Sequence, residues 1–196
     1  DQVLDDVIPA FEKLKDAGKT RFLGFTAKGD ADDLHKLVKC GAFSSAQVFY
    51  NLLVPSAGEA VPANYPADDF RQLLNVALDN GVGSIGVRVL AGGALSGSEA
   101  RHPLGMASVD PIGSETDYAT DVRRARQFIP LVEAGHAASL PELAIRYVIS
   151  NPALSTTEIG IATLEGLQQA AAAVNKGPLS DDALAQIKKV QAGFAV

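Results

Sequence analysis

The sequence has very little cysteine and no long apolar run. Its single cysteine, Cys40, excludes an intrachain disulfide and a cysteine-based metal cluster. No apolar stretch approaches the roughly 18 residues that a membrane-spanning helix needs. The amino terminus also lacks the charged and then apolar layout of a signal peptide. We therefore expect a protein that is not held in a membrane and that works in the cytoplasm.

Basic side chains are too few for a surface that binds polyanions. The 196 residues include 17 Lys and Arg against 23 Asp and Glu, a formal net charge of −6, and no segment is dense in Lys and Arg. This balance argues against nucleic acid or an anionic membrane as a partner and favours a small molecule. The hydrophobic content of 47% is ordinary for one folded domain.

Short apolar segments alternate with amphipathic helices along the chain. Strands are expected at about residues 20–26, 46–50, 84–89 and 157–161. Helices are expected before the first strand and after each strand, with apolar stripes that include Leu4, Val7, Ile8, Phe11 and Leu14, and Phe70, Leu73, Leu74, Ala77 and Leu78. This alternation predicts a parallel sheet whose strands are connected by helices.

Several local signals refine this assignment. Asp30 is expected to cap the second helix, and the run from Ser139 to Glu142 matches a capping box. Pro130 is expected to kink a helix that spans Tyr118 to Ala134. A stretch rich in Gly, Ser and Pro runs from Gly92 to about Asp117, and its length predicts a functional or disordered loop.

Two parallel architectures fit four strand-and-helix units. An open, doubly wound sheet would carry a glycine-rich phosphate loop after its first strand, and residues 26–30 (TAKGD) are not that pattern. The other architecture is the (β/α)₈ barrel, which closes with eight strands. Four units correspond to half of such a barrel.

Five segments in register resemble the aldo/keto reductase family. They are Gly18–Thr26, Gln47–Leu53, Val89–Gly97, Leu143–Tyr147 and Ile159–Thr163. The resemblance covers essentially the whole chain and implies the carboxyl-terminal half of a (β/α)₈ TIM barrel, from about the fourth barrel helix onward. Residues 1–196 would then form one incomplete domain.

The resemblance also implies where catalysis takes place. In the family, a Tyr that donates a proton works with Lys, His and Asp, and all four belong to the first four strand-and-helix units. No catalytic residue is therefore assigned in this chain, which we expect to be inactive alone. The intact parent is expected to transfer a hydride between NADP or NAD and a small carbonyl or sugar-like substrate.

The positions that match the family belong to its cofactor site, at the carboxyl ends of the strands. Thr26 and Gln47 match groups that bind the nicotinamide carboxamide. Without a cofactor role, Thr26 would cap a turn, and Gln47 would form hydrogen bonds with polar groups at a buried strand end. A second set matches the segment around the ribose and pyrophosphate: Arg88, Val89, Leu90, Ala91 and Gly93. Arg88 could instead form an ion pair with a carboxylate of the absent half.

The third set matches the adenosine phosphate site, where the last strand leads into a helix. It comprises Gly160, Ala162, Gly166 and Gln169. Gly166 stands where the family often has Arg or Gln, so the choice between NADP and NAD is left open. An alternative function is a non-catalytic cofactor-binding or interaction subunit. Unpaired strand edges further predict a homo-oligomer, or pairing with the missing amino-terminal half.

Overall fold

Four parallel strands form the centre of the molecule. The computed structural model describes residues 2–110, 114 and 117–195. Within these residues the strands are β1 (Gly24–Ala27), β2 (Ser45–Phe49), β3 (Gly83–Val87) and β4 (Thr156–Thr157). They are ordered β1-β2-β3-β4 in one sheet, so each strand pairs with the next along the chain. The predicted parallel sheet of four strands is confirmed.

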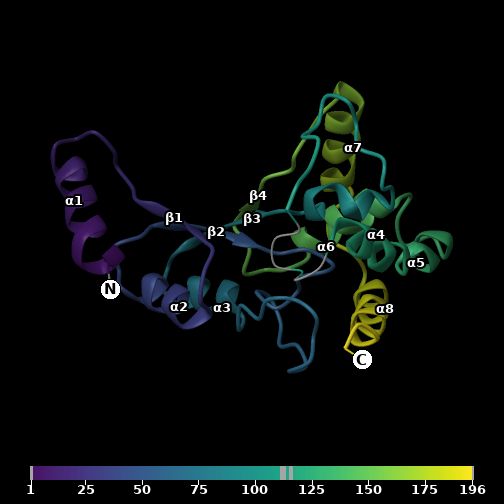
Figure 1. Cartoon of the computed structure of the whole chain (residues 1–196), viewed down its shortest axis with the longest axis horizontal. Coiled ribbons are helices and arrows are strands. Elements are labelled where there is room, and N and C mark those ends of the chain that lie inside the picture. The colour runs from purple at the N-terminus through teal and green to yellow at the C-terminus, as the bar shows by residue number, and fades with distance from the viewer. Residues whose placement is uncertain (1, 111–113, 115–116, 196) are drawn as a thin grey trace.

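The helices surround this sheet as an open arc (Figure 1). In chain order they are η1 (Val3–Val7), α1 (Ile8–Asp16), α2 (Ala31–Lys39), α3 (Leu73–Asp79), η2 (Ala91–Ser96), α4 (Tyr118–Arg126), α5 (Ile129–Glu133), α6 (Leu140–Ile149), α7 (Leu164–Asn175) and α8 (Asp181–Ala192). Helix α1 stands at one end of the arc, and α2 packs beside α3 below the sheet. At the other end, α7 packs on α6. No helix among the described residues is both long enough and apolar enough to cross a lipid bilayer.

Local capping signals define the helix boundaries well. The Asp30 side chain accepts from the backbone N–H of Asp32, as predicted. Of the predicted capping box, Ser139 Oγ accepts from the Glu142 N–H, but the Glu142 carboxylate binds Arg146 and Lys176 instead of the Ser139 N–H. Pro130 does more than bend a helix, because α5 begins at Ile129 and the expected helix 118–134 is two separate helices. Proline lacks an N–H and suits the first turn of a helix, so a break just before it is favoured.

The strand boundaries differ from the predicted ones. β1 begins at Gly24 instead of about residue 20, and its ladder pairs Gly24 with Ser45, the first residue of β2. β3 ends at Val87 because Arg88 takes a left-handed conformation, φ 59°. β4 can therefore pair with β3 over only two residues, Thr156 and Thr157. Residues 158–161 of the predicted strand 157–161 are not part of a strand.

The buried core lies between the sheet and the helices on its outer face. Ala46 and Val48 of β2 are buried on that side, as are Leu73, Leu74 and Ala77 of α3. Leu78, which was expected in the same stripe, is 58% exposed, so that part of the prediction is wrong. On α1 only Ile8 is buried, in a small cluster with Leu23 and Phe43.

Candidate functional site

A row of polar side chains crosses the sheet on the face opposite the helices. Thr26 pairs in register with Gln47, and Gln47 with Ile85, so their side chains share one face. Thr26 Oγ1 donates to Gln47 Oε1 at 2.8 Å. Gln47 Nε2 donates to Glu158 Oε1 at 3.4 Å, across β3. In a closed barrel this face would point to the interior, so the row marks a polar layer there.

The loop that follows β3 has an unusual backbone. Arg88 and Ala91 have φ of 59° and 48°, and Gly92 and Gly93 have φ of 65° and 108°. Left-handed conformations cost energy for residues with a Cβ, and such strain concentrates at functional sites. The loop turns the backbone sharply at the carboxyl end of a central strand, where barrel enzymes bind ligands.

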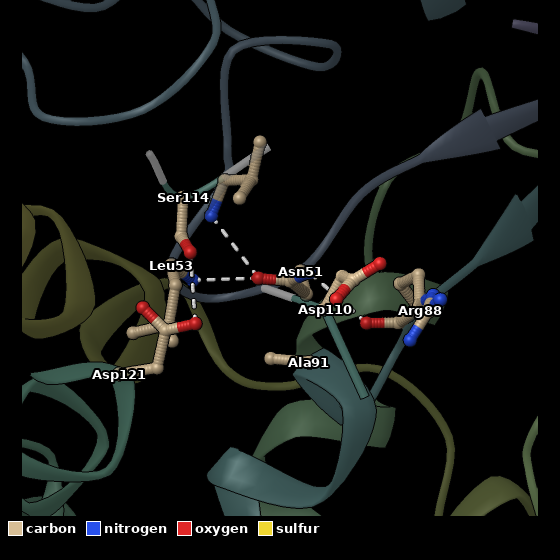
Figure 2. A pocket seen from close by; sticks show the side chains of 8 residues that line it. Asn51, Leu53, Arg88, Ala91, Asp110, Ser114 and Asp121 are labelled. Atoms are coloured by element: carbon tan, nitrogen blue, oxygen red, sulfur yellow. Dashed lines mark hydrogen bonds between the residues drawn. The ribbon is translucent and has the colours of Figure 1, made fainter. Parts of the chain in front are cut away.

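Asn51, in the loop that follows β2, holds the β3 loop in place. Its side chain is buried, with Nδ2 donating to the Arg88 carbonyl at 3.0 Å. Asn51 Oδ1 accepts from the backbone N–H groups of Leu53 and Val54 at 2.9 and 3.0 Å. Figure 2 shows Asn51 between Leu53 and Arg88, at the centre of a small pocket. One amide thus connects the loops that follow β2 and β3.

The Arg88 side chain is half-buried and faces the same loop. A Cβ added at Gly92 would lie 3.3 Å from Arg88 Nη1, so the guanidinium is beside the Gly92 backbone. Among the described residues, Arg88 has no carboxylate within ion-pair distance. Asp110 and Asp121 line the pocket that Arg88 also lines. Asp121 is buried and accepts from Ser114 Oγ at 2.8 Å.

The described part of the long segment after η2 folds back onto the β3 loop. Arg101 donates to the Gly92 carbonyl at 2.9 Å, and its guanidinium stacks over the Tyr118 ring at 5.1 Å. Val109 also packs against Gly92. The glycine-rich turn is therefore enclosed on one side by this segment, while the Arg88 guanidinium stays half-buried on the same loop.

The third group of expected cofactor residues lies where β4 leads into α7. Thr163 Oγ1 caps α7 by accepting from Gly166 N–H at 3.0 Å. Gly160 and Ala162 are exposed just before the cap, and Gln169 donates to Glu165 at 3.0 Å on the same helix. The amino terminus of a helix of this length carries partial positive charge and suits a phosphate group.

The structure brings some of the expected residues together and leaves others apart. Thr26 and Gln47 are in direct contact, and Arg88 to Gly93 form one turn. Val89 is almost fully buried, so only its backbone could reach a ligand. Among the described residues, no hydrogen bond joins Gly160, Ala162, Gly166 or Gln169 to the other two groups. The cofactor role of all these residues stays a prediction.

Sequence reasoning missed Asn51 and Glu158. Each is a polar residue that closely follows a strand, which is the only local signal that could have singled it out. Their partners are far away in sequence, 37 residues for Asn51 with Arg88 and 111 for Glu158 with Gln47. Only the sheet order places them in contact.

The tyrosine hydroxyls are engaged in structural contacts. Tyr65 Oη donates to the Leu53 carbonyl at 3.1 Å, and Tyr147 Oη donates to Glu59 at 3.1 Å. Burial raises the pKa of both groups. Tyr50 stacks on Tyr147 with ring centroids 5.3 Å apart, and Tyr118 Oη donates to the Ser98 carbonyl at 3.3 Å. None of these four tyrosines joins the polar row.

Comparison with known proteins now identifies the family. The sequence model of the aldo/keto reductase family matches residues 1–192, and the chain belongs to that family. The resemblance inferred from the five segments is thereby confirmed. No protein with a curated record matches this chain.

Solved structures share the fold. Aldo-keto reductase AKR11C1 from Bacillus halodurans in its holo form superposes with a TM-score of 0.63 at 19% identity, covering 95% of this chain. Its apo form gives the same TM-score at 20% identity. In both comparisons the match covers 56% of the other chain, so this chain spans little more than half the length of these structures. The four strands thus match part of an aldo-keto reductase barrel.

Proposed function

We propose that this chain supplies the cofactor side of an NAD(P)-dependent oxidoreductase. The observation that carries the proposal is the β3 loop, where the left-handed turn from Arg88 to Gly93 presents a half-buried guanidinium with no carboxylate partner among the described residues. A guanidinium in such a position favours an anionic ligand, and pyrophosphate is such a ligand. On the inner face, Gln47 lies on β2, the strand next to β3, and Thr26 lies one strand further, on β1.

The residues present fit a dinucleotide by their chemistry. Gln47 offers an amide to a carboxamide, and Gly92, which has no side chain, lets its backbone approach a phosphate closely. The Gly93 N–H donates to the Leu90 carbonyl and shapes the turn. The capped amino terminus of α7, with Gly160 and Ala162 exposed before it, suits a second phosphate. When bound, a nicotinamide dinucleotide would accept or donate a hydride, while this chain's groups would bind and orient it.

The tyrosine contacts support assigning the proton donor elsewhere. Tyr65 and Tyr147 are buried and hydrogen-bonded outside the polar row, and burial raises the pKa of each. We therefore propose that the chain alone does not reduce carbonyl compounds. Activity on a small carbonyl or sugar-like substrate would need further strand-and-helix units that carry the family's Tyr, Lys, His and Asp.

Substitution of Arg88 tests the cofactor site directly. We expect Arg88→Met to weaken binding of NADP⁺ and NAD⁺ to the purified chain by about tenfold to a hundredfold, because a charge-assisted hydrogen bond is lost. Isothermal titration calorimetry measures this, with Arg123→Met on the exposed face of α4 as the matched control. Equal affinity of both variants would contradict the proposal.

The same titration addresses the choice between the two dinucleotides. Gly166 offers no positive charge to a 2′-phosphate, and Gln169 is hydrogen-bonded to Glu165. We therefore expect NAD⁺ to bind at least as tightly as NADP⁺. A preference for NADP⁺ of about tenfold or more, the size of one good charge contact, would show that another basic group recognises the phosphate.

A further inference from the structure

The acidic side chain of Glu158 contacts one specific residue on the inner face of the sheet, Gln47. It follows β4 directly, and its backbone N–H donates to the Gly86 carbonyl at 2.9 Å. Thr156 pairs with Ile85 on β3, so Glu158, two residues later, lies on the same face as Ile85 and Gln47. The hydrogen bond from Gln47 Nε2 to Glu158 Oε1 spans β3 on this face.

This contact removes an ambiguity of the Gln47 side chain. An amide can rotate by half a turn and exchange its donor and acceptor ends. The Thr26 hydroxyl can donate or accept, so Thr26 alone would permit both orientations. An ionised carboxylate only accepts, so Glu158 requires the Nε2 end on its side and leaves Oε1 to accept from Thr26 Oγ1 at 2.8 Å.

The carboxylate also adds a negative charge to the inner face. Its nearest strand neighbours on this face are apolar or neutral, since Ile85 and Val87 belong to β3 and Thr156 to β4. Among the described residues, Glu158 has no Lys, Arg or His within ion-pair distance. An uncompensated charge acts strongly on a ligand that covers it, because the ligand excludes water.

We infer that Glu158 is a positioning residue that fixes the Gln47 amide and favours the oxidised form of the cofactor over the reduced form. The inference rests on the proposed function, in which Gln47 contacts the nicotinamide. An oxidised nicotinamide ring carries a positive charge and a reduced ring is neutral. A nearby carboxylate therefore lowers the free energy of the oxidised complex alone, which shifts the ratio of the two dissociation constants.

The experiment uses two variants that separate charge from hydrogen bonding. Glu158→Gln keeps an acceptor for Gln47 and removes the charge, whereas Glu158→Ala removes both. Dissociation constants for the oxidised and the reduced dinucleotide are measured by calorimetry on the full chain. We expect Glu158→Gln to weaken binding of the oxidised form by about three- to tenfold, the size of a screened charge interaction, and to change the reduced form less than twofold. Glu133→Gln on α5 is the matched control.

A second measurement tests the amide contact without any cofactor. The side-chain NH₂ resonances of Gln47, assigned with Gln47→Leu, should shift in Glu158→Ala and stay near the wild-type position in Glu158→Gln. Wild-type binding with an unchanged ratio in Glu158→Gln, or unmoved resonances in Glu158→Ala, would overturn the inference and leave the proposed function standing. Failure of the wild-type chain to bind either form would overturn the proposed function, and the charge effect with it.

Discussion

Asn51 is the residue whose single side chain does most to arrange the candidate site. It is 1% exposed, and its amide satisfies the Arg88 carbonyl together with the N–H groups of Leu53 and Val54. Buried backbone groups that lose their partners are costly, because they have already given up their hydrogen bonds to water. The shape of the Arg88 turn therefore depends on a residue in a different loop.

We expect Asn51→Ala to lower the free energy of unfolding by about 1–3 kcal/mol. The Leu53 N–H loses its partner, whereas the Arg88 carbonyl keeps its bond from Ala91 N–H and the Val54 N–H keeps its bond to the Asn51 carbonyl. Urea unfolding followed by circular dichroism measures this. Asn75→Ala is the control, because Asn75 Nδ2 makes only a long 3.4 Å contact with Gln72 in an exposed setting. A loss no larger than that of the control would mean that Asn51 does not hold the turn.

Gly92 is the second residue on which the turn depends, for a steric reason. It has φ of 65°, and an added Cβ would lie 2.7 Å from Val109 Cγ1. Gly92→Ala should therefore destabilise the chain by more than the roughly 1 kcal/mol that a left-handed alanine costs. Gly18 has φ of 69° and open space around its missing Cβ.

Gly18→Ala is accordingly the matched control, because it reports the backbone cost alone. Thermal unfolding of the two variants compares the costs, and the extra loss in Gly92→Ala measures the contact with Val109. If both variants lose the same stability, then the segment around Val109 does not press on the turn.

At the scale of elements, Glu142 connects two helices and the turn beyond them. On α6, it binds Lys176 at 2.7 Å, next to the end of α7, and Arg146 at 3.3 Å. Arg146 in turn donates to the carbonyls of Gly177 and Pro178, which lead into α8. Burial acts to raise the pKa of Glu142, but the hydrogen bond and charge of Lys176, together with hydrogen bonds from the Ala138 backbone and from Arg146, outweigh it, and the pKa is lowered overall.

This shift gives a pH dependence of known sign. Because the pKa of Glu142 is lower in the folded chain than its ordinary value of 4.5, the stabilisation is complete above that value and is lost as the pH falls through the folded pKa. We expect Glu142→Gln to lower the free energy of unfolding by about 1–3 kcal/mol near neutral pH, and by progressively less below about pH 4. Urea unfolding of the wild type and of Glu142→Gln across this pH range measures the difference, and Glu133→Gln is the comparison variant. A destabilisation by Glu142→Gln that does not depend on pH would contradict the role of the Glu142 charge.

The elements also show what sequence alone could and could not predict. Caps such as Asp30 and Ser139 are predictable because all of their partners lie within three residues. The parallel order follows from the alternation of short apolar segments and helices. The end of β4 depends on where β3 stops pairing, and β3 stops at the left-handed Arg88. The contacts of Asn51 and Glu158 depend on the complete sheet, so no local pattern reveals them.

The whole molecule exposes apolar side chains at both ends of the arc. At the β1 end, Phe11, Leu14 and Phe22 are 41%, 47% and 66% exposed; at the α7 end, Ile161, Leu164 and Leu167 are 43%, 71% and 52% exposed. Apolar surface of this kind, next to unpaired strand edges, favours association. We therefore propose that the isolated chain forms oligomers or binds the complementary half of a barrel.

Multi-angle light scattering tests this proposal. We expect the wild-type chain to run as a dimer or larger species, and the double change Leu164→Lys with Leu167→Lys to raise the monomer fraction. Gln168→Lys is the control, since it adds charge on an exposed neighbour without removing apolar surface. A monodisperse wild-type monomer would contradict the proposal.

The sequential strand order has a consequence for how such a chain can be altered. β1 to β4 follow one another in the sheet in the same order as in the sequence. Dividing the sheet between any two neighbouring strands therefore separates the chain into two continuous segments, and neither segment has strands on both sides of the division. Whole units could therefore be added, removed or exchanged at the edges while the remaining ladders keep their register.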